Sequence, residues 1–238
     1  MAKTETAMGG SKEGKGIRMP NVNDVRRELQ ETGRYMMQYG LAWGNAGNIS
    51  ARTGTDRCVI TASGTFLGEL AAEDLVECSF ADGPIDPAAK KPSKELPMHR
   101  AVYEERPDIH AVLHASPFYS TLFACADADP PRDLFVETMY YLEKVARVPY
   151  RHPGSADLAE AVRAKARSAN ILLLEHHGVL VYDTSLREAR MALQTLETAC
   201  RMLVVSRKSG IPLRSLDADT MHDFLNHAGY KPRRKWDG

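Results

Sequence analysis

The 238-residue sequence lacks both a net charge and a long apolar run. Lysine plus arginine and aspartate plus glutamate each number 31, so there is no global positive field to hold a polyanion. Nowhere do about 18 apolar residues run together, as an ordinary membrane-spanning helix requires. We therefore expect neither nucleic acid nor a membrane among the partners of this protein.

Cysteine is scarce and scattered. The sequence has no C-x-x-C pair and none of the dense spacing that marks a disulfide scaffold or a zinc knuckle; its cysteines are Cys58, Cys78, Cys125 and Cys200. Residues 1–16 are polar and charged, without the apolar run of a signal peptide. The sequence therefore predicts reduced thiols in a cytoplasmic protein, with a flexible N-terminal tail over residues 1–20.

The remaining residues, 21–238, have the length of a single α/β domain. Helical spacing of apolar residues follows Asn23 and Asp24, either of which could cap a first helix. Gly40 is placed to end this helix in a left-handed turn. A second helix is predicted from Glu95 to Glu105, because Pro107 follows it directly.

Short apolar runs predict the strands, which we place at residues 58–61, 109–114, 170–174 and 178–182. A hydroxyl at Ser185 and a carboxylate at Glu188 form a capping-box pattern ahead of a long amphipathic helix that ends at Gly210. Strands and helices alternate irregularly, and some strands lie close enough to form hairpins. We therefore predict a three-layer α/β/α fold around a central mixed, mainly antiparallel sheet.

Two histidines, His114 and His177, lie at the ends of apolar strand-like runs. A rigid sheet could aim both imidazoles over one cleft and bind a cation, although a strand-end histidine is more often structural. Glu95 could supply a carboxylate ligand, because it opens a helix whose free N–H groups favour an anion. An ordinary first-turn glutamate is the competing interpretation.

Small and amide-bearing residues form candidate anion sites. The run Gly-Asn-Ala-Gly-Asn-Ile-Ser at 44–50 could ring an anion with backbone and side-chain groups. The helix start after Pro92 could do the same, with a hydroxyl from Ser93 and a charge from Lys94. Each of these signals is weak when taken alone.

The order of these motifs resembles that of the class II aldolase and adducin family. The motifs are GNAGNIS at 44–50, TASG at 61–64, PSKE at 92–95, a strand ending in His114, and LLLEHHG at 172–178. The resemblance implies the class II aldolase-like fold and a catalytic divalent cation. It also implies that His114 and His177 are metal ligands, and that Glu95 is a third ligand or a catalytic acid/base beside the metal.

The resemblance further implies a phosphate site and an oligomer. The family binds the phosphate of its substrate with residues that correspond here to Gly47, Asn48, Ser63, Gly64, Ser93 and Lys94. Its members are commonly tetramers whose sites lie between subunits and receive a catalytic tyrosine from a neighbour. Tyr230 is the candidate for that tyrosine, although a tail aromatic packed on the surface is an equal alternative. We expect a small anionic substrate and a homo-oligomer, a tetramer or a multiple of it.

Three departures from the family pattern guide the functional hypothesis. The usual His-x-His is His114-Ala115-Ser116 here, which favours manganese, with zinc or iron(II) as alternatives. The usual Ser-Ser-Glu is Ser93-Lys94-Glu95, which adds a fixed positive charge, so a carboxylate could replace the phosphate. Residues 133–137 lack the tyrosine that the aldolases carry there.

From these departures we predict a metal-dependent carbon–carbon lyase that decarboxylates a hydroxylated aromatic or heteroaromatic dicarboxylate. An aldolase that cleaves a ketose phosphate is the main alternative. The further alternatives are a non-haem iron oxygenase and a non-catalytic, adducin-like interaction module.

Overall fold

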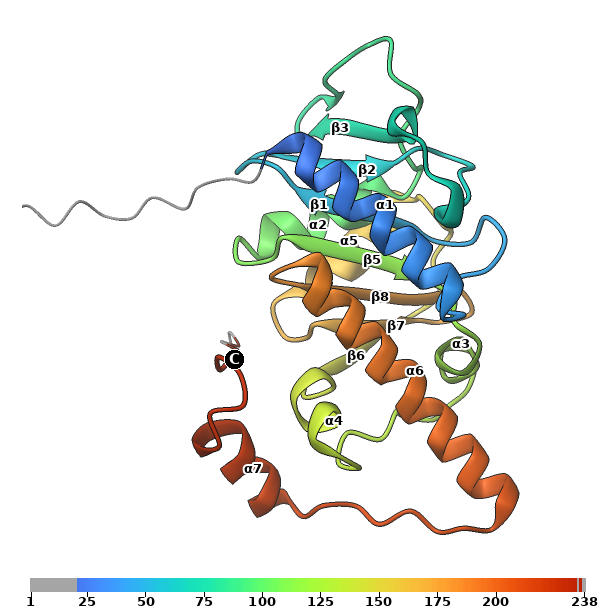
Figure 1. Ribbon diagram of the computed structural model, residues 1–238, viewed down its shortest axis with the longest axis vertical. Helices are drawn as coiled ribbons and strands as arrows, with labels where there is room; N and C mark the ends of the chain where they lie inside the picture. Colours follow the sequence, from blue (N-terminus) through green and yellow to red (C-terminus); the bar gives the residue numbers. More distant parts are fainter. Residues whose placement is uncertain (1–20, 235, 237–238) are drawn as a thin grey trace, which may run out of the picture.

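The fold is built around an eight-stranded sheet in the order β4-β3-β2-β1-β5-β8-β7-β6 (Figure 1). The structure is a computed structural model that describes residues 21–234 and Trp236, so the tail predicted at residues 1–20 lies outside the described residues. Neighbouring strands pair antiparallel, except β6 and β7, which are parallel. The prediction of a mixed, mainly antiparallel sheet is confirmed.

The strands are short, and the predicted ones appear within a residue or two of their expected places. Their bounds are β1 Asn48–Arg52, β2 Arg57–Thr61, β3 Leu75–Ser79, β4 Gly83–Pro84, β5 Ala111–Ala115, β6 Val145–Val148, β7 Ile171–Leu174 and β8 Gly178–Asp183. The helices are α1 Val22–Gln38, α2 Leu96–Glu105, α3 Phe118–Ala124, α4 Val136–Tyr141, α5 Ala156–Ala166, α6 Leu186–Ser209 and α7 Ala218–His227, with single 3-10 turns at Leu67–Glu69 and Ala72–Asp74.

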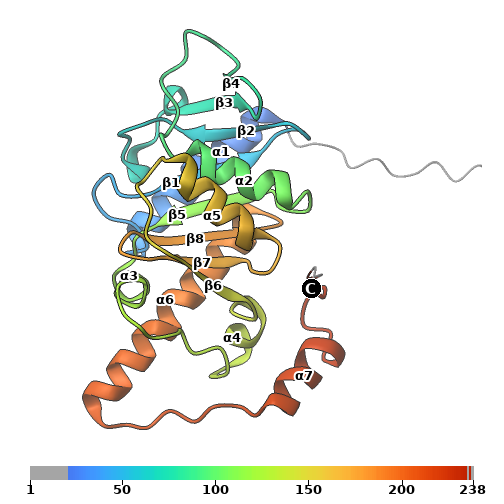
Figure 2. The ribbon, with the colours of Figure 1, turned by 180° about the vertical axis from the view of Figure 1, so that it is seen from behind.

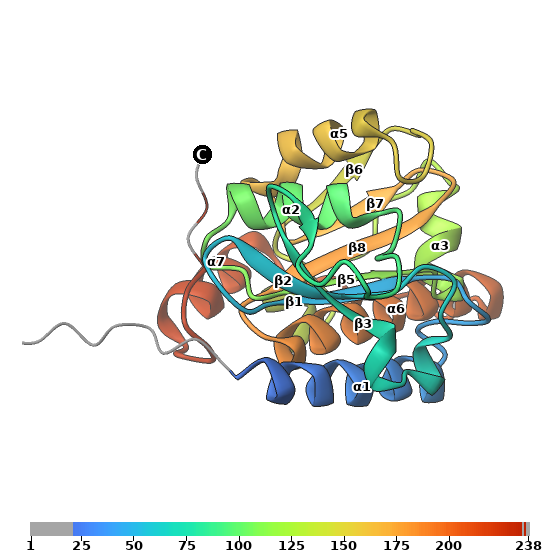
Figure 3. The same ribbon diagram turned by 90° about the horizontal axis from the view of Figure 1, so that it is seen from above.

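Helices cover both faces of the sheet, which confirms the three-layer prediction. Figure 3 shows α2 and α5 on one face and α1 and α6 on the other, and Figure 2 shows the α2/α5 face in front. The core beneath α1 and α6 also includes buried residues of α3 and α4. A second core lies beneath α2 and α5.

Alternation along the strands decides which side chains reach which layer. In β5, Leu113 packs into the core beneath α1 and α6, whereas Val112 packs into the core beneath α2 and α5. Successive residues of a strand point to opposite faces, so His114 shares the face of Val112. The imidazole is therefore directed to the side of the sheet on which α2 begins.

Helix α1 begins two or three residues earlier than the sequence indicated. Its N-cap is Asn21, whose side chain accepts a hydrogen bond of 2.8 Å from the backbone N–H of Asn23. The prediction of a cap at Asn23 or Asp24 is therefore wrong, because the extended backbone of Asn21 leaves its amide oxygen free to cap the first turn. The predicted left-handed turn at Gly40 is confirmed by a φ of 66°.

Helix α6 begins and ends at the predicted residues. Ser185 is its N-cap and accepts a hydrogen bond from the N–H of Glu188, and Gly210 follows the helix in the left-handed conformation. The reciprocal half of the predicted capping box is replaced by another contact. The carboxylate of Glu188 accepts hydrogen bonds from Tyr141 and Lys231, which tie α6 to α4 and to the C-terminal segment.

The cysteines are free thiols, and Cys58 and Cys78 stand opposite each other in the pairing of β2 with β3. Burial raises the pKa of Cys78 to about 11, and burial raises that of Cys58 further. Both thiols are therefore protonated near neutral pH. Among the described residues, no helix combines the length and the apolar character needed to cross a bilayer.

Replacing Ser185 by alanine should lower the free energy of unfolding by about 1 kcal/mol, the usual contribution of an N-cap hydroxyl. Urea denaturation followed by circular dichroism measures this loss. Ser215→Ala, in the exposed segment after α6, is the control and should leave the midpoint unchanged. Equal midpoints for both variants would contradict the assignment of Ser185 as the cap.

Candidate metal centre

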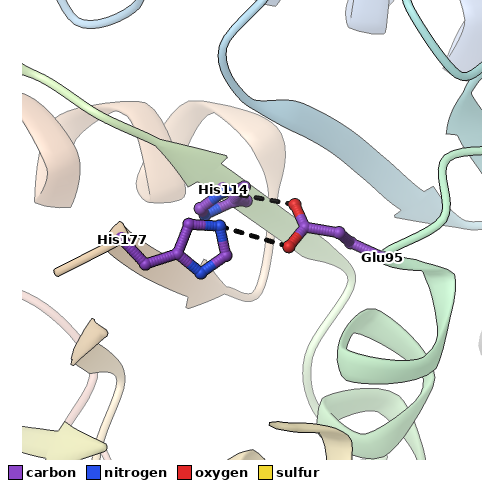
Figure 4. Close-up of side chains that lie close together, drawn as sticks. All are labelled: Glu95, His114 and His177. Atoms are coloured by element: carbon purple, nitrogen blue, oxygen red, sulfur yellow. Dashed lines mark ion pairs between the residues drawn. The ribbon is translucent and has the colours of Figure 1, made fainter. Parts of the chain in front are cut away.

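Three potential metal-ligating side chains converge at one end of the α2-facing side of the sheet (Figure 4). Glu95 precedes α2, His114 lies in β5, and His177 lies in the turn between β7 and β8. The Oε2 atom of Glu95 is 3.3 Å from Nε2 of His114, and its Oε1 atom is 3.3 Å from Nε2 of His177. The three potential ligand atoms lie within 4.8 Å of one another.

The backbone of β8 fixes the orientation of the His114 ring. Nδ1 of His114 lies 3.0 Å from the carbonyl oxygen of Val179. A carbonyl can only accept a hydrogen bond, so Nδ1 carries the hydrogen and the Nε2 lone pair is left to face Glu95. Metal-binding histidines are commonly oriented by such a bond from the other ring nitrogen.

Two glycines allow the backbone to approach the strand end that carries His114. A Cβ atom on Gly47 would lie 2.6 Å from the carbonyl oxygen of His114, and one on Gly178 would lie 2.5 Å from that of Ala115. Gly47 also has a φ of 98°, which side-chain-bearing residues rarely adopt. Glycine at these positions lets the loop before β1 and the start of β8 close around the histidine.

Burial keeps the His177 imidazole neutral. The pKa of His177 is lowered to about 4, chiefly by burial and next by the charge of His114, while Glu95 acts in the opposite direction. Above that pH, the imidazole of His177 is neutral and has a lone pair to give. The Glu95 carboxylate is 8% exposed and accepts a hydrogen bond of 2.8 Å from Nδ2 of Asn48.

These residues fit a divalent cation. Oε1 of Glu95 is buried without a hydrogen-bond partner within the described part of the chain, although it faces the Nε2 atom of His177. Two ligand atoms bound at about 2.1 Å to one cation stand about 3.0–3.4 Å apart, which agrees with the separations between Glu95 and the histidines. Neutral imidazoles and a carboxylate are ligands that zinc, manganese and iron(II) all accept.

Ser116 occupies the place where the family pattern expects another imidazole. Its hydroxyl lies on the cavity wall and donates a hydrogen bond of 3.2 Å to the carbonyl of His177. The indole N–H of Trp43 donates to the carbonyl of Ser116 at 2.9 Å. Ser116 therefore braces the turn that carries His177, and its hydroxyl hydrogen is directed at that backbone.

The three side chains open into a cavity of about 520 Å³. The residues predicted to bind an anion all line it together with the three metal-ligand candidates: Gly47, Asn48, Ser63, Gly64, Ser93 and Lys94. The cavity wall also includes Trp43, Thr65, Ser116 and Pro153. Trp43, Thr65 and Pro153 are not among the site residues predicted from the sequence. Trp43 and Thr65 directly adjoin the motifs at 44–50 and 61–64, so adjacency to these motifs could have found them, whereas Pro153 reaches the cavity only through the folding of the chain.

Tyr230 lies away from this cavity. Its ring packs on Tyr140 and Phe224 in the C-terminal segment, and it is 39% exposed. This segment lies near the opposite end of β5 and β8, where Arg234 is paired with Asp183. Within one chain, the structure does not bring Tyr230 to Glu95 and the two histidines.

A larger cavity of about 780 Å³ lies beside the C-terminal segment and the end of β8. Charges in its wall are paired with one another, as in Arg106 with Asp108, Arg234 with Asp183 and Lys231 with Glu188. These pairs stabilise the position of the segment. The smaller cavity is therefore the candidate site, because the potential ligand atoms of Glu95, His114 and His177 converge there.

Comparison of the sequence with known proteins identifies a family domain and several relatives. Residues 27–204 match the Class II Aldolase and Adducin N-terminal domain. A 3-oxo-tetronate 4-phosphate decarboxylase of Haemophilus influenzae is 32% identical over 207 residues, covering 85% of this chain and 97% of the relative. A 5-methylthioribulose-1-phosphate/5-deoxyribulose-1-phosphate aldolase of Escherichia coli O45:K1 is 32% identical over 181 residues, covering 76% and 83%.

The fold is also similar to that of solved structures. The crystal structure of YgbL from Klebsiella pneumoniae superposes with a TM-score of 0.76 at 32% identity, covering 85% of this chain and 98% of that chain. The matched family domain spans Glu95, His114 and His177, whereas Tyr230 lies outside it.

Gly47→Ala should weaken the binding of Mn²⁺ about tenfold or more, because the new methyl group would collide with the His114 carbonyl and shift the ring. Gly83→Ala is the matched control. Gly83 also has a positive φ, but its added Cβ would meet no described atom within 4 Å. Isothermal titration calorimetry on the metal-free proteins measures both affinities, and equal losses in the two variants would show that only backbone strain matters.

Proposed function

The chain belongs to the class II aldolase and adducin family, and from that premise we propose that this lyase decarboxylates a phosphorylated 3-oxo acid in a site built around a divalent cation. The observation that carries the proposal is the union, in one cavity, of the Glu95, His114 and His177 cluster with an anion cradle. Such a cavity can hold both ends of a short substrate that is anionic at each end.

The anion cradle has hydrogen-bond donors that are not already committed. The Oγ atom of Ser93 accepts a hydrogen bond from the backbone N–H of Glu95, which leaves its own hydrogen free to donate to a ligand. Lys94 is exposed at the cavity wall and can add a positive charge. Ser63 and Gly64 line the same cavity as Ser93 and Lys94. Because both residues are small, an anion can approach their backbone.

The substrate proposed here differs from the aromatic or heteroaromatic dicarboxylate expected from the sequence. The names of the relatives do not support that substrate, whereas they do include the decarboxylation of a phosphorylated 3-oxo acid and the cleavage of sugar phosphates. In the sequence, the charge of Lys94 indicates that a carboxylate could replace the phosphate. A lysine serves a phosphate equally well, because it acts as a point charge on either anion.

In the proposed reaction, the bond between the carboxylate carbon and C2 breaks, its electron pair moves toward the C3 oxygen, carbon dioxide leaves, and C2 takes up a proton. A bound divalent cation supplies electrostatic stabilisation for the oxygen on which negative charge develops. Glu95, His114 and His177 would hold that cation. Lys94 and Ser93 would hold the phosphate, which fixes the distance between the two ends of the substrate.

We propose manganese as the metal, with zinc or iron(II) as the alternatives. The protein offers two imidazoles and one carboxylate, while the hydroxyl of Ser116 is directed at the His177 carbonyl. A set with fewer nitrogen ligands and more oxygen favours manganese relative to zinc. Residues 21–238 would form one catalytic domain, with reduced thiols suited to the cytoplasm.

The proton for C2 would come from a neighbouring subunit. Glu95 is available as an acid/base only if it is not fully engaged as a ligand, so a second donor is needed. Tyr230 is the candidate, in a homo-oligomer, a tetramer or a multiple of it, because its position beside Tyr140 and Phe224 leaves it far from its own subunit's site. Its exposed fraction of 39% leaves the ring accessible to another copy of the chain.

An aldolase acting on a ketose 1-phosphate is the second candidate function. The E. coli relative with that activity is also 32% identical, so identity alone does not separate the two reactions. The two reactions share the requirement for charge stabilisation at a carbonyl oxygen. They differ in the leaving fragment, which is carbon dioxide in one case and an aldehyde in the other.

The protein reconstituted with Mn²⁺ should release carbon dioxide from 3-oxo-tetronate 4-phosphate, and His114→Ala or His177→Ala should reduce kcat/KM at least about 100-fold, as expected when charge stabilisation is lost. His110→Ala is the control, because His110 directly precedes β5, at the end far from His114, and its ring contacts the Asp108 carbonyl. Release of an aldehyde from a ketose 1-phosphate without carbon dioxide from the oxo acid would favour the aldolase instead.

Lys94→Met should raise KM for the phosphorylated substrate about 10- to 100-fold, because a hydrogen bond to a charged group contributes about 1.5–3 kcal/mol. The affinity for Mn²⁺ should stay unchanged, since the lysine is not among the three candidate ligands. Lys91→Met, at another exposed lysine three residues earlier, is the matched control. Steady-state kinetics with both variants tests the assignment, and an unchanged KM in Lys94→Met would remove Lys94 from the phosphate site.

A further inference from the structure

A chain of buried polar side chains runs from Glu95 into the layer between α2 and the sheet. Nδ2 of Asn48 donates to Glu95, and Oδ1 of Asn48 is 2.6 Å from Nε2 of His99. Nδ1 of His99 is 2.7 Å from the hydroxyl of Ser50, which is 2.8 Å from the hydroxyl of Tyr103. His99 and Ser50 are fully buried.

The chemistry of the chain ends forces the direction of each bond. The carboxylate of Glu95 can only accept, so the Asn48 amide must present its nitrogen to Glu95 and its oxygen to His99. Nε2 of His99 must then carry the hydrogen, and Nδ1 must accept one from Ser50. The Ser50 oxygen can in turn accept from the Tyr103 hydroxyl.

The surroundings keep each member in the protonation state that these directions require. Burial lowers the pKa of His99 to about 3, with a smaller contribution from the charge of His114, so the ring is neutral with one donor and one acceptor. Burial also raises the pKa of Tyr103 well above its ordinary value, so the phenol remains a donor. A neutral imidazole with a fixed hydrogen can hold both Asn48 and Ser50.

We propose that His99 is a positioning residue for the metal centre, which acts on Glu95 through the Asn48 amide. The imidazole fixes the amide with its nitrogen toward Glu95, and the amide holds Oε2 so that both carboxylate oxygens face the two histidines. This inference rests on the proposed metal site and deepens it. His99 lies outside the ligand cluster, and no described bond joins it directly to Glu95, His114 or His177.

The amide of Asn48 has a second orientation that His99 prevents. Rotation by half a turn would place Oδ1 against the carboxylate, where two acceptors repel, and Nδ2 against Nε2–H of His99, where two donors meet. Without the imidazole, Oδ1 of Asn48 loses its hydrogen bond from Nε2 of His99, and Asn48 is free to move away from Glu95. The structure therefore predicts looser positioning of the carboxylate and weaker metal binding when His99 loses its donor.

The first experiment measures Mn²⁺ affinity by calorimetry in the metal-free protein, without any substrate. His99→Leu should bind Mn²⁺ about 10- to 100-fold more weakly than the wild type, the range typical of residues that orient a ligand. His99→Gln, which keeps an N–H for Asn48 and an acceptor for Ser50, should recover most of the affinity. Wild-type affinity in a folded His99→Leu protein would overturn the proposal.

Val102→Ala is the matched control for a purely structural effect. Val102 is fully buried on the same helix and belongs to the apolar core rather than to the polar chain. This variant should lower the melting temperature and leave the Mn²⁺ affinity within about twofold, because it removes packing and no orienting bond. A loss of affinity equal to that of His99→Leu would overturn the inference, since general loosening of α2 would then explain both.

The second experiment keeps the proposal falsifiable if His99→Leu does not fold. In the wild-type, metal-free protein at neutral pH, ¹⁵N NMR of the histidine rings should show His99 as the tautomer with hydrogen on Nε2. The tautomer with hydrogen on Nδ1 would overturn the proposal, because it requires the opposite orientation of Asn48. A wild-type protein that shows the expected tautomer, with hydrogen on Nε2, but binds no metal would contradict the metal centre of the proposed function. It would thereby also contradict the role assigned to His99.

Discussion

The pairing of β1 with β5 is the constraint on which the candidate site depends. In this register Asn48 of β1 stands opposite His114 of β5. Asn48, which donates a hydrogen bond to Glu95, is therefore next to His114, whose ring faces Glu95. The closeness of Gly47 to the His114 carbonyl is a consequence of the same alignment. A slip of β1 by one residue against β5 would turn Asn48 to the opposite face of the sheet and separate it from Glu95 and His114.

Strand β1 has apolar side chains on one face and polar side chains on the other. Ile49 and Ala51 point into the apolar core beneath α1 and α6, whereas Asn48, Ser50 and Arg52 point to the α2 side, where each is buried. Burial of polar groups is costly unless each finds partners. Here Arg52 donates to the carbonyls of Ile109 and Tyr103, and Asn48 and Ser50 bond to His99. On the α2 side of β1, buried hydrogen bonds with fixed directions therefore take the place of some apolar contacts.

Much of this architecture could be predicted from local sequence signals. The strand at residues 58–61, the cap at Ser185 and the turn at Gly210 are confirmed, because each depends on residues adjacent in the chain. Capping of α1 by Asn21 was missed, since several neighbouring polar residues could serve. The resemblance of the motif order to that of the family implied that Glu95, His114 and His177 form one site. The bonds from His99 to Asn48 and Ser50 could not be predicted, because they join residues about 50 positions apart through the strand register.

The shortness of β4 has a consequence for the behaviour of the protein in concentrated solution. Growth of ordered aggregates requires an open row of backbone donors and acceptors at the edge of a sheet. This edge offers a strand of two residues, and one of them, Pro84, has no backbone N–H to donate. Molecules that collide at β4 therefore find almost no template on which to add a strand. Strand β4 can remain uncovered without itself seeding insoluble β-structure.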